Sequence, residues 1–376
     1  MQFVIITHVP HSKQDGLYYA YAPYVREMNV WGENVDELVV VAPVTDCKKS
    51  DIDSSYIHQN IQLIAISKFD VLSLRSVLAT LFKLPKIIWT IFKAMKNADH
   101  IHLRCPGNVG LVACFVQILF PNKIKTAKYA GNWDPQSKQP WTYQLQQWVL
   151  SNTFLTRNMQ VLVYGEWEGM TENIKPFFTA TYKEEDKQPI VTKDLKSTIK
   201  FVFVGTLVKG KNPLYAIQLV ENLYKKGIAV SLRMYGEGIE RKKLEHYVLD
   251  KNLDSLIHFE GNQSKERIQK AYQESHFVLL ASESEGWPKA IAEGMFWGCV
   301  PIATAISCIP YMLDYGNRGV LLEMDLEEDC KQVIDLINNQ KVCDAMQTKA
   351  VDWSRHYTLD IFESEIKKLL NTSNLH

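Results

Sequence analysis

Short apolar runs alternate with amphipathic stretches along most of the chain. The first two runs are QFVIIT at 2–7 and ELVVVAP at 37–43, and the stretch from Leu17 to Trp31 between them predicts a helix. A strand, a loop, a helix and a second apolar strand form a βαβ unit. Because the apolar runs lack strict alternation, they favour a parallel sheet that is covered on both faces.

The same rhythm predicts two series of strands and helices. Further strands are predicted at 61–66, 100–104, 123–131 and 159–165, then at 201–206, 230–236, 257–261, 276–282 and 300–304, the last being the final core strand. Helices are predicted at 212–227, 241–248, 265–275, 289–298 and 352–370. The stretch 181–200 is charged and poor in large apolar residues, which indicates a linker.

The fold prediction is therefore α/β, with two Rossmann-like doubly wound domains that face one cleft. The predicted parts are an N-terminal domain at 1–185, a linker or hinge at 186–199, a C-terminal domain at 200–351 and a C-terminal helical segment at 352–376.

Composition and charge exclude several classes of protein. The 376 residues carry 42 Lys and Arg against 42 Asp and Glu, and this zero net charge argues against a nucleic-acid partner. Seven scattered cysteines without a CxxC pair indicate reduced thiols, and no secretory signal is expected. The longest uncharged run, 105–122, is too short and too interrupted for a membrane span. We expect a cytoplasmic protein.

The segment 281–304 carries the most informative chemistry. A strand ends at Ser282, and the loop and helix start that follow supply Glu285, Gly286, Trp287, Pro288, Lys289 and Glu293. A helix N-terminus offers unpaired N–H groups to a phosphate, and carboxylates accept hydrogen bonds from sugar hydroxyls. The alternative is that both glutamates are merely solvated.

The spacing of Glu285 and Glu293, E-x7-E within SEGWPKAIAEGMFWGCVPI, resembles the signature of retaining glycosyltransferases of the GT-B fold, family 4 (glycosyl transferases group 1). The resemblance implies that Glu285 is the catalytic carboxylate near the anomeric centre of the donor sugar and that Glu293 binds the nucleotide ribose. It also implies that backbone amides from Gly286 to Lys289, including Trp287, hold the sugar and distal phosphate. Pro288 departs from the commoner glycine and has no N–H to donate.

A second stretch, FVGTLVKGKNPLYAIQLVENL at 203–223, also resembles this family. Gly205 and Lys211 match the glycine and the lysine of the family, whereas Thr206 stands where the family has arginine. In the family, the arginine and the lysine neutralise the diphosphate leaving group. Lys209 is a candidate for the missing charge, and the alternative is a solvated turn. Two weaker matches, MYGEG and HFEGN, place Gly236 and Gly261 in the donor site.

The N-terminal half matches the family only loosely. The resemblance places Gly16 near the phosphates, and Arg104 and Asn132 in loops on the acceptor side. The mid-domain histidine of many members is absent from KTAKYAGNWD, where Tyr129, Asn132 or Asp134 is a candidate to replace it. The segment 352–376 resembles the family tail that crosses back onto the first domain.

No metal and no cofactor are expected. His8 and His11 have HxxH spacing without the helical context of a zinc site, and Asp51 and Asp53 form a D-x-D that we interpret as a surface turn. His100 and His102 share one face of a strand and are predicted to be structural.

Residues 68–128 are basic and apolar, and two interpretations stay open. One is docking on an anionic membrane surface. The other is a pair of core helices, split at Pro85, with ordinary solvated lysines.

The predicted function is transfer of a sugar from a nucleotide-diphosphate sugar donor to an acceptor hydroxyl with retention, in surface polysaccharide or glycolipid assembly. The acceptor is expected to be a sugar or a lipid-linked oligosaccharide, and the enzyme to be peripheral on the inner face of the cell membrane. Two alternatives stay open: a nucleotide-sugar epimerase on the same fold, and a catalytically degenerate GT-B subunit.

Overall fold

The computed structural model describes residues 1–47, 49–50, 52–69 and 74–371, without the side chains of 74–81. It divides into an N-terminal unit, Met1–Phe178 with the chain from Phe362 onward, and a C-terminal unit, Thr179–Ile361. Asp51 of the D-x-D motif lies outside the described residues, as do parts of the predicted segments 68–128 and 352–376.

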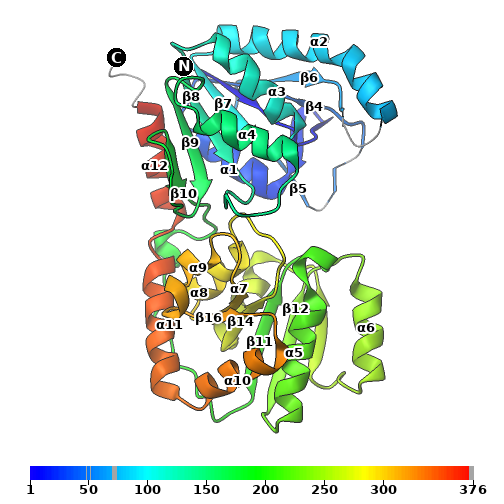
Figure 1. The fold of residues 1–376 in the computed structure, drawn as a ribbon, viewed down its shortest axis with the longest axis vertical. Coiled ribbons are helices and arrows are strands. Elements are labelled where there is room, and N and C mark those ends of the chain that lie inside the picture. The colour runs from blue at the N-terminus through cyan, green and yellow to red at the C-terminus, as the bar shows by residue number, and fades with distance from the viewer. Residues whose placement is uncertain (48, 51, 70–73, 372–376) are drawn as a thin grey trace. The chain divides into compact units, whose positions relative to one another are not determined.

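The N-terminal unit is built on a seven-stranded parallel sheet in the order β10-β9-β8-β7-β1-β4-β6 (Figure 1). Its strands are β1 (Gln2–Ile6), β4 (Glu37–Pro43), β6 (Ile61–Ile66), β7 (His100–Cys105), β8 (Ile124–Tyr129), β9 (Met159–Tyr164) and β10 (Ile174–Phe177). The short strand β10 was missed by the sequence pattern because its central residues, Lys175 and Pro176, are exposed.

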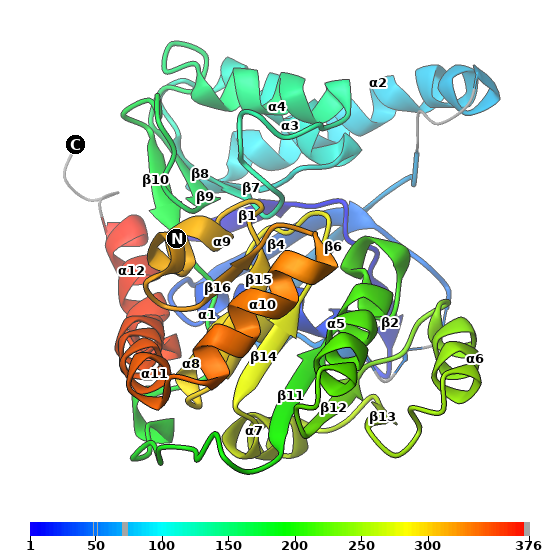
Figure 2. The same ribbon diagram turned by 60° about the horizontal axis from the view of Figure 1, so that its bottom comes forward.

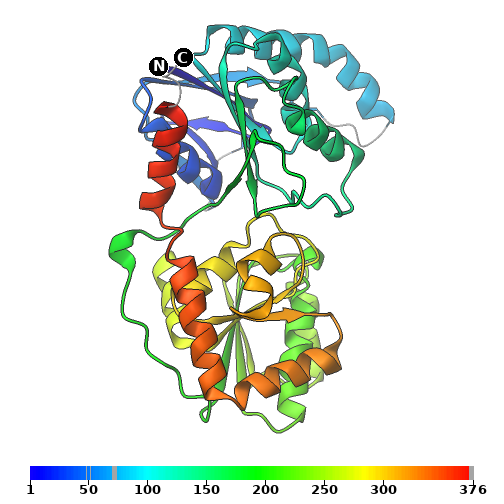
Figure 3. The same cartoon turned by 60° about the vertical axis from the view of Figure 1, so that its left-hand side comes forward.

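Helices cover both faces of this sheet. One face carries α2 (Leu74–Asn97), α3 (Asn108–Val116) with the 3-10 turn η1 (Gln117–Leu119), and α4 (Trp141–Ser151) (Figure 2). The other face carries α1 (Ala22–Gly32) and the last helix, α12 (Leu359–Asn371), drawn in red in Figure 3. The interpretation of two helices split at Pro85 is wrong, because α2 runs through this proline.

A small antiparallel sheet corrects the prediction of a helix from Leu17. β2 (Ser12–Gln14), β3 (Leu17–Tyr21) and β5 (Asp53–Ser55) pair in the order β2-β3-β5. Asp15 and Gly16 have positive φ angles of 51° and 79°, which is the geometry of a tight hairpin turn. Gly16 therefore lies in a hairpin turn rather than in a plain loop before a helix.

The C-terminal unit holds a six-stranded parallel sheet in the order β13-β12-β11-β14-β15-β16. Its strands are β11 (Ile199–Val204), β12 (Val230–Tyr235), β13 (Ile257–Gly261), β14 (Phe277–Leu280), β15 (Val300–Thr304) and β16 (Val320–Leu322). The prediction that 300–304 is the last strand is wrong, because the short β16 follows it at the edge.

The helices of this unit at 213–296 follow the predicted order after β11, whereas those at 309–312, 326–337 and 340–354 were not predicted. They are α5 (Pro213–Lys225), α6 (Arg241–Asp250), α7 (Lys265–Glu274), α8 (Lys289–Phe296), α9 (Ile309–Met312), α10 (Leu326–Ile337) and α11 (Gln340–Ser354), and the 3-10 turns are η2 (Glu184–Asp186), η3 (Lys209–Lys211) and η4 (Asp314–Gly316). α5 and α10 pack together over one face of the sheet (Figure 2). The predicted helix 352–370 is wrong as one element, because the chain turns between α11 and α12.

The predicted linker runs along the C-terminal unit. Leu195 is buried in its core, and the Lys193 ammonium donates to the Gly298 carbonyl at 3.1 Å. No described helix is long and apolar enough to cross a membrane.

Candidate functional site

The carboxyl ends of β11 and β14 bring a cation and a carboxylate together. These strands are neighbours in the sheet, so the loops that follow them meet at one edge. The Lys211 ammonium, in η3 after β11, donates to Glu285 Oε1, in the loop after β14, at 2.5 Å. Glu285 is buried, whereas the Lys211 side chain is 30% exposed. The sequence placed both residues in one site, and the structure pairs them.

Hydrogen bonds fix the backbone around this pair. The Glu283 N–H donates to the Gly210 carbonyl at 2.9 Å, which joins the two loops. The Glu285 N–H donates to Ser307 Oγ at 3.2 Å, and the Cys308 thiol donates to the Gly286 carbonyl at 3.1 Å. The loop after β15 thus holds the Glu285 loop from the other side.

The predicted donor-site glycines include one position where the backbone approach excludes a side chain. A Cβ on Gly236 would lie 2.0 Å from the Gly205 carbonyl oxygen, and its φ is +134°. The Gly236 N–H donates to the Gly261 carbonyl at 2.9 Å, and the Gly205 N–H donates to the Tyr235 carbonyl at 2.9 Å. The loops after β11, β12 and β13 are therefore packed backbone against backbone, with Gly205, Gly236 and Gly261 together.

Trp287 packs into an aromatic cluster. Its ring lies 6.1 Å from the Trp353 ring and 5.5 Å from the Tyr357 ring, centroid to centroid. Trp353 in turn stacks under the Arg318 guanidinium at 4.8 Å. Pro288 directly precedes α8, so the helix starts without a donor from that residue. The cluster anchors the loop from its buried side.

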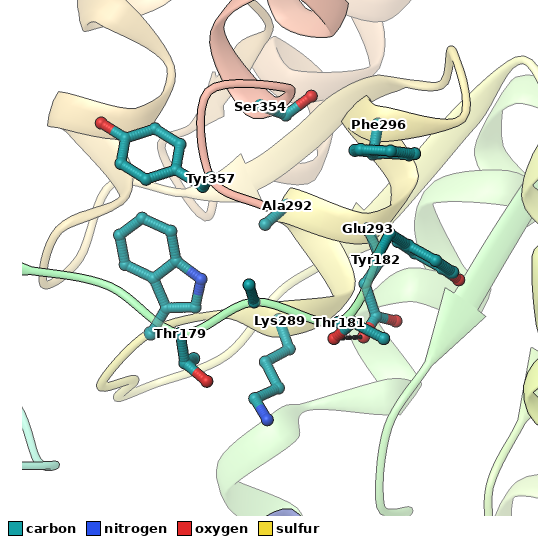
Figure 4. Close-up of a pocket in the computed structure, with 11 residues that line it drawn as sticks. Thr179, Thr181, Tyr182, Lys289, Ala292, Glu293, Phe296, Ser354 and Tyr357 are labelled. Carbon is teal, nitrogen blue, oxygen red and sulfur yellow. Dashed lines mark hydrogen bonds between the residues drawn. The ribbon is translucent and has the colours of Figure 1, made fainter. Parts of the chain in front are cut away.

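Glu293, on the second turn of α8, is engaged by protein hydroxyls (Figure 4). Thr181 Oγ1 donates to Glu293 Oε1 at 2.7 Å, and Tyr272 donates to Oε2 at 3.3 Å. Burial raises the pKa of Glu293, and the Thr181 hydrogen bond and the Lys289 charge partly oppose the rise. The pocket beside it measures about 20 Å³, which is room for about one water. A ribose at Glu293 would replace the Thr181 hydroxyl.

Thr206, which stands where the resembled family has arginine, lies between β11 and Lys211. Thr206 and Lys209 are both exposed, and Lys209 lies in the same 3-10 turn as Lys211. Lys209 is thus near enough in the chain to serve the same anion as Lys211.

In the N-terminal unit, Arg104 is held in a buried ion pair. Its guanidinium donates to Glu27 Oε1 at 2.9 Å, and the Lys128 ammonium lies 4.0 Å from the same oxygen. Burial acts to lower the pKa of Arg104, but the Glu27 carboxylate outweighs it and the pKa is raised. Asn132 organises its own loop, because its Oδ1 accepts from the Asp134 N–H at 2.9 Å. Tyr129 donates to Gln139 Oε1 at 2.9 Å.

Three buried histidines of this unit contact protein groups. His11 shares 2.8 Å and 2.9 Å contacts with the Val9 carbonyl and the Tyr56 hydroxyl, and burial lowers its pKa to about 4. His100 and His102 both contact Thr126 Oγ1, and burial lowers the pKa of His100 to about 3. The structural interpretation of His100 and His102 is confirmed.

Several residues of these networks were missed by the sequence analysis. Ser307 and Cys308 lie in the loop after β15, so the rule that sites gather at strand ends would have found them. Glu27 lies on the buried side of α1 beside Tyr24, Met28 and Trp31, and a charge on an apolar stripe was a usable signal. Thr181 carried no such signal.

The order of strand, loop and helix around Glu285 has counterparts among known proteins. Residues 184–353 match the family Glycosyl transferases group 1. The matched segment includes both glutamates of the E-x7-E pair and the loop with Lys211.

Curated relatives match over a similar length of chain. The chain is 25% identical over 169 residues to an uncharacterized glycosyltransferase of Methanocaldococcus jannaschii, covering 45% of this chain and 46% of that protein. It is 25% identical over 175 residues to poly(ribitol-phosphate) alpha-N-acetylglucosaminyltransferase of Staphylococcus aureus, covering 46% of this chain and 34% of that protein. The chain thus spans less than half the length of these relatives.

Solved structures match over the whole chain. Anabaena HepE in complex with UDP aligns over 99% of both chains, with a TM-score of 0.69 and 13% identity. This likeness shows a shared fold. The prediction of two Rossmann-like α/β domains of the GT-B class is confirmed.

Proposed function

We propose that this chain is a retaining glycosyltransferase that takes a nucleotide-diphosphate sugar as donor and a sugar or lipid-linked oligosaccharide as acceptor. The observation that carries the proposal is the Lys211–Glu285 pair at the carboxyl ends of β11 and β14. A nucleotide-diphosphate sugar carries its phosphate one bond from the anomeric carbon. A cation that can face the phosphate, hydrogen-bonded to a carboxylate that can face the sugar, matches that arrangement.

In this proposal each group has a distinct task. Lys211, helped by Lys209, neutralises the leaving diphosphate, because charge that develops on a leaving group is best met by a fixed cation. Glu285 accepts hydrogen bonds from hydroxyls of the donor sugar near the reacting carbon. Glu293 binds the ribose in place of Thr181, and the backbone amides of Gly286, Trp287 and Lys289 hold the sugar and phosphate. The attacking and leaving oxygens share one face, so no protein nucleophile is needed. Side-chain cations and the N-terminus of α8 take the role that a metal would have at the diphosphate, and no cofactor takes part.

The comparisons support the donor and acceptor classes. The HepE structure contains UDP, and the Staphylococcus aureus relative is named for transferring N-acetylglucosamine to poly(ribitol-phosphate). We therefore place this chain in surface polysaccharide or glycolipid assembly, on the cytoplasmic side of the membrane. The N-terminal unit is the proposed acceptor side, with Gly16 and Asn132 in its loops, whereas Arg104 is engaged by Glu27 in a buried ion pair. No comparison favours the epimerase alternative.

Nucleotide binding is the first test. Purified protein is screened by thermal shift with UDP, GDP, ADP and their common sugar conjugates. A ligand at 100 times its dissociation constant adds about 2.7 kcal/mol of stability. We expect a shift with one base, lost in Lys211→Ala and Glu293→Ala and kept in the control Lys226→Ala, an exposed lysine beyond α5.

Turnover and stereochemistry are the second test. With the donor identified, the anomeric configuration of the product is read by NMR. Glu285→Ala should abolish transfer, whereas Glu283→Ala, an exposed glutamate in the same loop, should not. An inverted product overturns the retaining mechanism. A chain that binds no nucleotide, or whose role survives Glu285→Ala, is the degenerate subunit instead.

A further inference from the structure

Three helices of the N-terminal unit form one layer with an unusual outer surface. α2, α3 and α4 lie side by side on one face of the seven-stranded sheet, and α3 packs against both neighbours (Figure 2). Their inner sides are buried in the core, through residues such as Ile87 and Ile91 of α2, Ala113 of α3 and Val149 of α4. We call these three helices, with η1 and the turn to residue 158, the α2–α4 layer.

The outer side of the α2–α4 layer exposes large apolar side chains on every helix. They are Phe82, Ile88 and Trp89 of α2, Phe115 and Leu119 of α3 and η1, Trp141 and Trp148 of α4, and Phe154 in the following turn. Phe82 is 89% exposed and Trp148 is 59% exposed. Single exposed apolar residues are ordinary, but a set spread over adjacent helices marks an interaction surface.

The aromatic residues follow the helical period. Phe82 and Trp89 are seven residues apart in α2, as are Trp141 and Trp148 in α4, so each pair lies on one side of its helix two turns apart. Two exposed lysines of α2 share this spacing of seven residues. Lys86 lies between Phe82 and Trp89 in the sequence, and Lys93 follows Trp89. The Lys93 ammonium lies 5.2 Å from the centre of the Trp89 ring.

The charge of this surface has one sign. Between residues 74 and 158, the only acidic residues in the sequence are Asp99 and Asp134, and neither lies in α2, α3 or α4. The chain as a whole is neutral, so the excess of lysine and arginine over acidic residues in this stretch is local. Arg157 continues the pattern, with its guanidinium 4.7 Å from the Phe154 ring.

We infer that the α2–α4 layer docks on an anionic lipid surface. Tryptophan and lysine are the side chains that favour the boundary between lipid headgroups and acyl chains, and lysine and arginine are attracted to anionic headgroups. A second copy of the same face would oppose cation to cation, which disfavours self-association through it. The inference needs no nucleotide, so its test is independent of the proposed transferase activity.

The test is flotation of the full chain with vesicles of phosphatidylglycerol and phosphatidylcholine in equal parts, and with vesicles of phosphatidylcholine alone. We expect binding to the anionic vesicles and release at about 1 M salt, where the Debye length falls to about 3 Å. Trp89→Ser with Trp148→Ser, and separately Lys86→Glu with Lys93→Glu, should each weaken binding by about tenfold or more.

A matched control variant changes an exposed aromatic residue and an exposed lysine in the C-terminal unit. Tyr224→Ser with Lys226→Glu deletes an exposed aromatic ring and reverses an exposed lysine at the end of α5, and it should bind as the parent does. All of these positions are exposed, so the melting temperature and the nucleotide-induced shift should be unchanged. Equal binding to both vesicle types, no binding, or equal loss in the control overturns the inference. So does a dimer, seen by light scattering, that the layer variants dissociate.

Discussion

Two buried carboxylates of this chain differ in how they are paired and in how a ligand could reach them. Glu285 and Glu27 are both buried carboxylates, yet they face different partners. Glu285 meets one lysine that is still partly exposed, so a ligand can reach the pair. Glu27 lies between Arg104 and Lys128, away from solvent. Buried charges without a partner are costly, so the second arrangement is structural.

Replacing Glu27 should therefore destabilise the N-terminal unit. Glu27→Ala removes the carboxylate that pairs with the buried Arg104 guanidinium, and breaking a buried pair costs about 3–5 kcal/mol. Urea unfolding measures the change in the free energy of unfolding. Glu37→Ala, at a less buried carboxylate in the same unit, is the control. A loss below about 1 kcal/mol, the worth of an exposed pair, contradicts this account.

His11 should make stability depend on pH. Burial lowers its folded-state pKa to about 4 from an ordinary value of 6.5. Between these values the unfolded chain binds a proton that the folded chain does not, so stability falls as pH falls. The contribution is about 1.4 kcal/mol per pH unit. In His11→Gln this part of the pH dependence should vanish. Urea unfolding from pH 7 to pH 4 measures the free energy of unfolding of the parent and of the variant, and we expect the difference between the two to shrink as the pH falls. A constant difference between the two proteins refutes it.

At the scale of elements, the site depends on how closely the strand-end loops approach each other. The loops after β11 and β12 are joined by the Gly205–Tyr235 hydrogen bond and by one from the Leu207 N–H to the Glu237 carbonyl at 2.9 Å. Gly236 lies at their closest point. The position of Lys211 is therefore set by a neighbouring loop as well as by its own.

Gly236→Ala should move these loops apart. Its Cβ would overlap the Gly205 carbonyl, and its positive φ is unfavourable for alanine, so we expect a loss of about 1–3 kcal/mol. We also expect weaker nucleotide binding in the thermal-shift assay. Gly210→Ala, where a Cβ meets nothing within 4 Å, should change the free energy of unfolding little. If both variants are equally stable, the close approach does not constrain the site.

Elements were predictable where their pattern is local. The helices from 212 to 298 and most core strands follow from apolar spacing, and the E-x7-E segment is one continuous strand, loop and helix. The hairpin at Asp15–Gly16 and the edge strands β10 and β16 are too short for periodicity to detect. The Lys211–Glu285 contact joins residues 74 positions apart, and Thr181–Glu293 joins residues 112 apart. Such contacts depend on strand order, which spacing alone does not provide.

At the scale of the whole molecule, the chain crosses between its two units twice. The crossings fall at Phe178–Thr179 and at Ile361–Phe362. Within the C-terminal unit the segments beside them are bonded together, because the Leu359 N–H donates to the Tyr182 carbonyl at 2.8 Å. Within the N-terminal unit Phe362 packs against Phe177 and Phe178, at 5.5 Å and 5.7 Å between ring centroids. The last helix thus returns the chain to the unit in which it began.

This connection predicts that the two units can be made to unfold separately. Phe362→Ala removes a fully buried ring from the N-terminal unit, which costs about 3–5 kcal/mol. It leaves the donor residues of the C-terminal unit untouched. In differential scanning calorimetry we expect the single transition of the parent to split into two, with the lower-temperature transition assigned to the N-terminal unit.

The nucleotide found in the thermal-shift screen should then raise only the upper transition, because ligand binding stabilises the unit that holds its site. Phe154→Ala, which removes an exposed ring from the same unit, should not split the transition. If the nucleotide raises the lower transition instead, the donor site lies in the N-terminal unit and the assignment of Lys211 and Glu285 is wrong.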